Sequence, residues 1–287
     1  MSVERAAAFS EILARPRFEI IPAKGAERQA DHLPEAAKVP VTCSPTKGIE
    51  STLRLSERLL ERGFEVVPHI AARLVADEAH LQEILRWLDQ RGVREIHVIG
   101  GDSKKPVGPY ASALALLGAM SRLEHGVERV GIGAYPEGHP LIGDGELDRA
   151  LLDKQPFSSY VVTQLCFDAG AILDWISGVR RKGIGLPVYV GVPGAVDRTK
   201  LLRISLKVGV GDSVRFLKKQ SGLVGALLKP GGYSPDGLVE ALAPYAGDGE
   251  YGITGLHIYT FNQVESTEAW RQRRLSPEKV GAENTAR

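Results

Sequence analysis

The residues of this sequence that are best suited to chemistry are acids, imidazoles, amides, phenols and a threonine that follow short apolar runs. They are Glu19, Thr42, His69, Asp102, Tyr135, His139, Gln164, Tyr259 and Asn262. Singly, each has an ordinary structural explanation, because a threonine or an aspartate after a strand often caps the next helix. Gathered around one pocket, they could bind and protonate a small organic substrate.

Glu19 lies in the apolar run Arg17–Pro22. Successive side chains of a strand point to opposite faces, so Glu19 points away from Phe18 and Ile20. The proline ends the run and places Glu19 near the end of the strand. A carboxylate among apolar neighbours loses hydration, so its pKa is expected to rise. The alternative is an ordinary, solvent-exposed glutamate of an edge strand.

Eight β-rich runs alternate with helical patterns at intervals of roughly 25–30 residues, the size of a βα unit. The predicted strands are residues 17–22, 39–43, 64–70, 94–99, 129–135, 158–165, 186–192 and 253–259. The predicted helices are residues 49–62, 77–91, 110–123, 145–154, 169–182, 199–208, 213–221 and 235–245. Such alternation predicts a parallel sheet. Eight units favour a closed (β/α)8 TIM barrel, with an open doubly wound sheet as the alternative.

The barrel is expected to form a single catalytic domain over residues 1–275, followed by a polar tail at residues 276–287. In a parallel barrel the carboxyl ends of all strands meet on one face, where active sites are built. Seven of the eight predicted strands bring a residue of the polar set to this face. The seventh ends in Gly191–Gly194 and offers only backbone. This distribution predicts an enzyme that acts on a small molecule.

Composition narrows the class of protein. The chain has 287 residues, and its formal charge of +1 gives no reason to expect nucleic acid or an anionic membrane as partner. No apolar run reaches the ~18–20 residues that span a bilayer, and the charged residues near the start exclude a signal peptide. Cys43 and Cys166 lie far apart, and the scattered histidines predict no metal site. A reduced, cytoplasmic protein is the simplest interpretation.

Two other motifs offer competing chemistry. Lys229 could be a Schiff-base lysine at a strand end, as in barrel aldolases, although an ordinary loop lysine explains it as well. Gly209–Val214 loosely matches a dinucleotide fingerprint, but it follows a predicted helix and lacks the third glycine.

Several segments resemble the methylenetetrahydrofolate reductase family, in the same order and over about residues 18–263. Residues 18–22 resemble its FEFFPP start, and residues 134–140 its AYPExHP motif. Residues 163–168 resemble its TQFFFD motif, and residues 257–262 its HFYTLN motif. Shorter matches are Pro68–Ile70, Gly101–Asp102 and Tyr110–Ser112.

The resemblance implies a (β/α)8 barrel that reduces 5,10-methylenetetrahydrofolate to 5-methyltetrahydrofolate, usually with hydride passing from NAD(P)H through bound FAD. It implies that Glu19 is the general acid and that Asp102 stabilises the cation formed on the folate. Gln164, Thr42 and Tyr259 would bind the substrate. The positions that match a cofactor pocket are His69, Tyr135, His139, Tyr110 and Ala111.

The sequence departs from the family where FAD is held. The basic pair expected on the helix after AYPExHP falls on Leu152 and Asp153, which cannot neutralise a diphosphate. Gly100 replaces an arginine before Asp102, and the aromatic residue expected after strand seven is absent near residues 198–200. We therefore expect little or no bound FAD.

The expected hydride donor is NADH, with NADPH possible, and hydride would pass directly to the folate. NADH is favoured because no cluster of arginines for a 2′-phosphate can be placed. Three alternatives remain: the same reaction through FAD, a folate-binding or methyl-transferring barrel without redox chemistry, and a lyase that uses Lys229.

Overall fold

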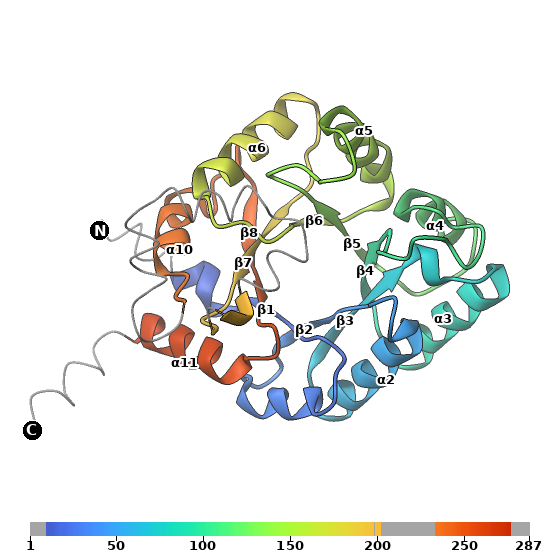
Figure 1. The fold of residues 1–287 in the computed structure, drawn as a ribbon, viewed down its shortest axis with the longest axis horizontal. Coiled ribbons are helices and arrows are strands. Elements are labelled where there is room, and N and C mark those ends of the chain that lie inside the picture. Colours follow the sequence, from blue (N-terminus) through green and yellow to red (C-terminus); the bar gives the residue numbers. More distant parts are fainter. Residues whose placement is uncertain (1–9, 198, 202–232, 277–287) are drawn as a thin grey trace, which may run out of the picture.

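A computed structural model describes residues 10–197, 199–201 and 233–276 of the chain. Its eight strands are all parallel and close into one barrel in sequence order, with β1 paired to both β2 and β8 (Figure 1). The strands are β1 (Arg17–Glu19), β2 (Lys38–Val41), β3 (Glu65–Ala71), β4 (Glu95–Ile99), β5 (Arg129–Ala134), β6 (Tyr160–Thr163), β7 (Val188–Pro193) and β8 (Ile253–Tyr259). This confirms the (β/α)8 TIM barrel and excludes the doubly wound sheet.

Helices surround the barrel, and most of them bury apolar side chains against it (Figure 1). They are α2 (Gly48–Glu61), α3 (Glu78–Gln90), α4 (Ala113–Met120), α5 (Asp144–Lys154), α6 (Ala169–Arg181), α10 (Asp236–Leu242) and α11 (Val264–Leu275). Short 3-10 helices η1 (Ala26–His32), η2 (Ala72–Leu74), η3 (Gln155–Phe157) and η4 (Ala243–Tyr245) complete the connections.

The helix starts follow from side-chain caps. Asp77 accepts a hydrogen bond from the backbone N–H of His80, and Ser112 and Asp168 cap α4 and α6 in the same way. Gly183 follows α6 with a φ of +84°, a left-handed conformation that glycine adopts without strain.

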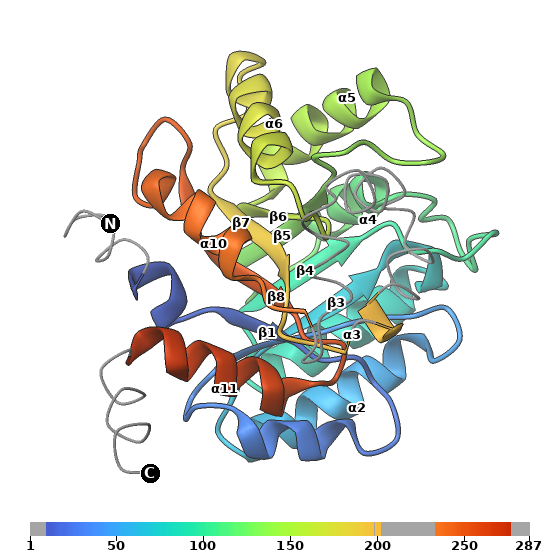
Figure 2. The same cartoon turned by 60° about the vertical axis from the view of Figure 1, so that its left-hand side comes forward.

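The sequence analysis missed α11. Its Glu268 and Arg271 are buried and paired, with Arg271 Nε 2.7 Å from Glu268 Oε2. Arg271 also donates to the carbonyl oxygens of Leu13 and Ala14, which tie the helix to the start of the chain. Because charged residues occupy its buried face, α11 lacks the apolar period that marks an amphipathic helix. α11 lies beside α10 (Figure 2), and Trp270 donates to Asp236 across the contact.

Other expectations fall partly or wholly outside the described residues. They are the helices at 199–208 and 213–221, Lys229, the Gly209–Val214 motif and most of the tail at 276–287.

The amino end of the barrel interior is closed by a charged cluster. Arg17 Nη1 lies 2.7 Å from Glu95 Oε1 and donates to the Tyr160 hydroxyl at 2.8 Å. The guanidinium also lies over the rings of Tyr160 and Tyr189, at 4.3 and 3.8 Å from their centroids. Lys38 donates to the second oxygen of Glu95 at 2.8 Å. The floor of the barrel is therefore ionic, and its charges are paired.

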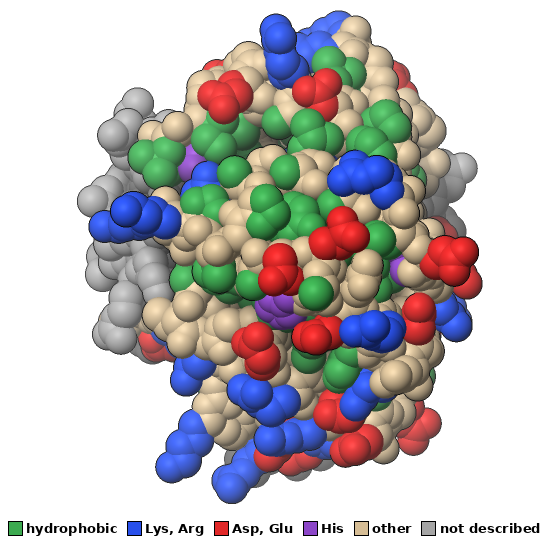
Figure 3. All heavy atoms as spheres, turned by 90° about the vertical axis from the view of Figure 1, so that its right-hand side faces the viewer, with side chains coloured by type: hydrophobic (Ala, Val, Ile, Leu, Met, Phe, Trp, Pro, Cys, Tyr) green, Lys and Arg blue, Asp and Glu red, His purple; other side chains and the backbone are tan. Residues whose placement is uncertain are grey.

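The outer surface over α3 and α4 carries acidic and basic side chains of both signs, with hydrophobic ones between them (Figure 3). Of the large hydrophobic residues that the structure describes, Leu141 and Val107 are the most exposed, on loops that follow β5 and β4. Within the described ranges, no helix combines the length and the apolar character needed to cross a bilayer.

Candidate active site

Glu19 is the last residue of β1, and its side chain points into the barrel. The residue is only 6% exposed, so it is not the solvent-exposed glutamate of the alternative interpretation. Its Oε2 lies 3.0 Å from Nε2 of His257 on the neighbouring strand β8. Burial raises the pKa of the carboxyl to about 7, although a charge on His69 would lower it. Glu19 can therefore hold a proton near neutral pH.

The exit of β1 is fixed by residues that follow β8. Asn262 accepts a hydrogen bond from the N–H of Ile21 at 2.8 Å and donates to its carbonyl oxygen at 2.9 Å. Thr260 donates to the carbonyl oxygen of Glu19. These bonds hold the backbone that directly follows the Glu19 side chain, so Asn262 has a positioning role here.

Three buried histidines fill the barrel below Glu19. The rings of His69 and His97 are 4.6 Å apart, and those of His69 and His257 are 6.4 Å apart. Burial lowers the pKa of His257 to about 3 and that of His69 to about 4, and it also lowers the pKa of His97. All three imidazoles are therefore neutral at physiological pH. In the part of the chain that the structure describes, no three metal-binding side chains are placed to hold a metal ion.

Tyr259 connects Glu19 to the other side of the barrel mouth. Its hydroxyl donates to the carbonyl oxygen of Thr163 on β6 at 2.9 Å, passing over Gly191 of β7. Burial raises the pKa of Tyr259 well above its usual value, with further contributions from the charges of Glu19 and Tyr135. Burial and the neighbouring Asp102 likewise raise the pKa of Tyr135. Electrostatic interactions thus link Glu19 to Tyr259, Tyr259 to Tyr135, and Tyr135 to Asp102.

Gly191 provides the space that Tyr259 occupies. A Cβ atom at this position would lie 2.1 Å from the Thr163 carbonyl oxygen and 2.7 Å from Cε2 of Tyr259. We expect Gly191→Ala to displace β7 and Tyr259 and to lower the free energy of unfolding by roughly 1–3 kcal/mol, measured by urea denaturation. The control is Gly185→Ala, where an added Cβ would have no heavy atom within 4 Å. Equal stability of the two variants would contradict this account.

Asp102 is exposed on the loop after β4, and Arg73 fixes that loop. Arg73 donates through Nε to the carbonyl oxygen of Ala111 at 2.9 Å and through Nη1 to that of Ser103 at 3.1 Å. Its backbone N–H donates to the carbonyl oxygen of Gly100. The part played by Ala111 here is to accept the hydrogen bond of Arg73 with its carbonyl oxygen.

Two of the remaining predicted residues, His69 and Tyr110, are buried and do not lie at the rim of the barrel mouth. His69 is inside the barrel and not at its rim, because β3 continues for two residues beyond it. Tyr110 is buried near the first turn of α3, where burial and the charges of Glu78 and Asp77 raise its pKa.

Thr42, Gln164 and His139 lie just after β2, β6 and β5, each half-buried. The N–H of Thr42 donates to the carbonyl oxygen of Ile20 at 3.0 Å. Gln164 accepts the N–H of Leu165 through its side-chain oxygen at 2.8 Å. The His139 ring packs edge-on against Tyr135 with centroids 5.0 Å apart. Six of the predicted residues, Glu19, Thr42, Asp102, Tyr135, Gln164 and Tyr259, therefore lie on the carboxyl face, from six strands.

Comparison with known proteins gives the family. The sequence model of the methylenetetrahydrofolate reductases matches residues 25–210, which is more than half of the chain. The chain belongs to the methylenetetrahydrofolate reductase family. The matched range includes Asp102, Tyr135 and Gln164, whereas Glu19 and Tyr259 lie outside it.

A solved structure from Burkholderia cenocepacia J2315, provisionally named a lyase/mutase, is also similar to this reductase-family chain. The two sequences are 14% identical, and the alignment covers 100% of this chain and 90% of the other, with a TM-score of 0.45.

A bound FAD would need cations for its diphosphate, and α5 fits this need poorly. Leu152 is 38% exposed and Asp153 is exposed, at the two positions where a basic pair was expected. The first turn of α5 carries Asp144 and Glu146, which would repel a diphosphate at that helix end. Lys154 follows these two positions directly and is half-buried at the end of α5. Leu152 and Asp153 do not supply the basic pair that a diphosphate would need.

His97 and His257 belong to this reductase-family site but were not among the residues predicted from the sequence. The predicted residues were polar ones at strand ends, whereas both histidines lie within strands. The sequence could have indicated His257, because strand side chains alternate between the two faces of a sheet. His257 stands two residues before Tyr259 and therefore points inward on the same face.

Proposed function

We propose that this protein reduces 5,10-methylenetetrahydrofolate to 5-methyltetrahydrofolate with NADH as hydride donor. One proton is added to N10 of the folate, and the bond between N10 and the bridging carbon breaks to leave an iminium cation at N5. Hydride from NADH then adds to the iminium carbon. NADH is oxidised to NAD⁺, and one proton is consumed in each turnover.

The observation that carries this proposal is the buried carboxyl of Glu19 at the mouth of the barrel. A general acid works best when its pKa lies near the working pH, and burial raises the pKa of Glu19 to about 7. Glu19 would give its proton to N10, and the neutral His257 beside it would hold the carboxyl in place. Asp102 is exposed at the same face, where its charge would stabilise the cation.

We further propose that hydride passes directly from NADH to the iminium carbon, without bound FAD. An iminium ion accepts hydride readily when the two reactants are held together. The acidic start of α5 and the absence of a basic pair at Leu152 and Asp153 support this route. Gln164, Thr42 and Tyr259 would contact the folate, and the mouth residues Tyr135 and His139 would face the nicotinamide donor.

The decisive experiment is an absorption spectrum of the purified protein, followed by an assay of NADH oxidation. We expect no flavin absorbance, and we expect NADH oxidation that requires methylenetetrahydrofolate and does not increase when FAD is added. A yellow protein with stoichiometric flavin that bleaches with NADH would contradict the direct route. Absence of folate-dependent NADH oxidation, with and without FAD, would contradict the reductase function itself.

A further inference from the structure

The loop between β4 and α4 is fixed at several points to the segment that follows β3. Arg73 accepts the N–H of Val107 with its carbonyl oxygen at 2.9 Å, and its side chain donates to the carbonyl oxygen of Ser103 at 3.1 Å. Gly108 packs so closely on this segment that an added Cβ would lie 1.9 Å from the carbonyl oxygen of Ala76. The loop is thus held on both sides of its tip, the stretch between Ser103 and Val107, and this preorganises the tip for a ligand.

The tip of the loop carries two adjacent, exposed cations, Lys104 and Lys105. Ser103 Oγ donates to the carbonyl oxygen of Lys105 at 2.7 Å and so closes a short turn that carries both side chains. Within the described ranges, neither lysine has a carboxylate at ion-pair distance. Asp102 is the only acidic residue of this loop sequence, so the loop has an excess of positive charge, to which Arg73 adds. Two neighbouring cations on a fixed turn suit a compact dianion.

The same loop exposes an apolar side chain just beyond the lysines. Val107 is 64% exposed, which is unusual for a large hydrophobic residue of this structure. Two residues of chain span at most about 7 Å, so Lys104 lies within this distance of Asp102, and Val107 within this distance of Lys105. Asp102 itself interacts electrostatically with Tyr135 at the barrel mouth. The loop therefore presents an acid at the mouth, then two cations, then an apolar surface.

We infer that this loop holds the outer half of NADH, with Lys104 and Lys105 on the diphosphate and Val107 against the adenosine. This inference rests on the proposed function, which places the nicotinamide of the donor at the barrel mouth. The diphosphate and the adenosine follow the nicotinamide along NADH in the order in which the lysines and Val107 follow Asp102 along the loop. The charges of a diphosphate are close together, as the two lysines are. An exposed valine offers the apolar contact that an adenine ring can use.

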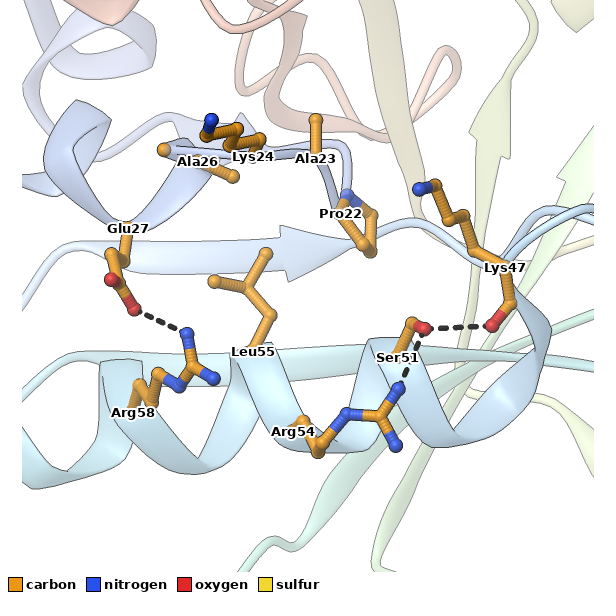
Figure 4. A pocket seen from close by; sticks show the side chains of 11 residues that line it. Pro22, Ala23, Lys24, Ala26, Glu27, Lys47, Ser51, Arg54, Leu55 and Arg58 are labelled. Atoms are coloured by element: carbon orange, nitrogen blue, oxygen red, sulfur yellow. Dashed lines mark hydrogen bonds and ion pairs between the residues drawn. The ribbon is translucent and has the colours of Figure 1, made fainter.

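A second group of cations near the mouth fits a diphosphate less well. It lines the groove between the chain that leaves β1 and the outer side of α2, and it includes Lys47, Arg54 and Arg58 (Figure 4). Arg58 is already paired with Glu27 at 2.7 Å. Along α2, Arg54 is about 10 Å beyond Lys47, and Arg58 is about 6 Å further. These cations are spread along a line, whereas Lys104 and Lys105 can contact one compact group together.

The test measures dissociation constants of the full-length protein for NADH and for ADP-ribose, which has the diphosphate and the adenosine but no nicotinamide. We expect Lys104→Ala/Lys105→Ala to weaken binding of both by about 3- to 30-fold, since two exposed ion pairs contribute on that order. This loss should shrink as salt rises. Val107→Ala should weaken binding of both by about 2- to 5-fold, because it removes apolar contact and no charge.

Two controls separate the diphosphate from the rest of the donor and from net charge. Reduced nicotinamide riboside carries the hydride but no phosphate and no adenosine, so its KM should be the same in Lys104→Ala/Lys105→Ala and in the unchanged protein. Arg181→Ala/Lys182→Ala removes the same charge at the C-terminal end of α6, on the amino side of the barrel, and should keep the affinity for NADH and for ADP-ribose.

Four results would overturn the inference. The first is equal affinity of the unchanged protein and Lys104→Ala/Lys105→Ala for NADH and ADP-ribose. The second is the same loss with reduced nicotinamide riboside as with NADH. The third is an equal loss in Arg181→Ala/Lys182→Ala. The fourth is weaker binding of 5-methyltetrahydrofolate with NADH binding intact, which would assign the lysines to the folate. Folate-dependent NADH oxidation is a separate measurement: its absence, with lysine-dependent NADH binding present, would contradict the reductase function and not the loop site.

Discussion

Glu19→Gln is expected to lower the turnover number on the order of 10²–10⁴-fold while folate binding is largely kept. Glutamine has nearly the same shape and can still form a hydrogen bond with Nε2 of His257, but it has no proton of suitable acidity for N10. The loss therefore falls on ring opening, which precedes hydride transfer. The measurement is steady-state NADH oxidation together with calorimetric binding of 5-methyltetrahydrofolate. Unchanged turnover would remove Glu19 from the mechanism.

The pH profile gives a second readout of the same prediction. Because burial raises the pKa of Glu19 to about 7, the protonated form is available below this pH and is lost above it. Turnover of the unchanged protein should therefore fall as pH rises through about 7, and the residual turnover of Glu19→Gln should not show this step. His257 and His69 do not titrate in this range, because burial holds their pKa values near 3 and 4. Glu83→Gln, on the exposed face of α3, is the matched control and should keep the step.

The strand ends of the barrel could be predicted from the sequence because a parallel barrel repeats one simple pattern. Each strand is a short β-rich run, and the residue that follows it must lie on the carboxyl face. Glu19 and Tyr259 were placed correctly for this reason, and the backbone pairs them directly in register between β1 and β8. The raised pKa of Glu19 also followed from its apolar neighbours.

The barrel interior could not be predicted in the same way. The contact between His69 and His97 depends on the register of β3 and β4 and on how far each strand extends, which local residue patterns do not fix. Gly131 shows the same limit: a Cβ there would lie 2.6 Å from Nδ1 of His97, so this glycine makes room for a histidine 34 positions earlier in the chain. The fit between a glycine on one strand and a large side chain on its neighbour can be seen only once the register of the two strands is known.

Arg17→Met should cause the largest loss of stability among single substitutions in the barrel floor. The side chain of Arg17 is 2% exposed and that of Glu95 is 8% exposed, and Lys38 remains beside Glu95 at 2.8 Å after the substitution. Removing one member of a buried ion pair costs up to about 3–5 kcal/mol when the other charge is left unpaired, so the contact with Lys38 should keep the loss near the lower end of this range. The guanidinium contacts with Tyr160 and Tyr189 are lost as well. The free energy of unfolding by urea is the measurement.

Two comparisons separate the ion pair from simple packing. Lys182→Met breaks the exposed pair of Lys182 with Asp148 and should cost no more than about 1 kcal/mol. Arg17→Met/Glu95→Gln removes both charges, so it should be more stable than the sum of the two single losses predicts. Additive losses in this double variant would show that the stability comes from packing alone.

The pH dependence of the Arg17→Met loss has a definite sign. Burial opposes ionisation of Glu95, but the charges of Arg17 and Lys38 outweigh it and lower the pKa from 4.5 to about 2, which corresponds to about 3 kcal/mol. A depressed pKa stabilises the folded state above the unfolded value, and this stabilisation disappears as pH falls through the folded value. The difference between the unchanged protein and Arg17→Met should therefore be present at neutral pH and should shrink as pH falls toward 2. A difference that stays constant over this range would mean that Arg17 acts through its contacts with the two tyrosines and not through the charge of Glu95.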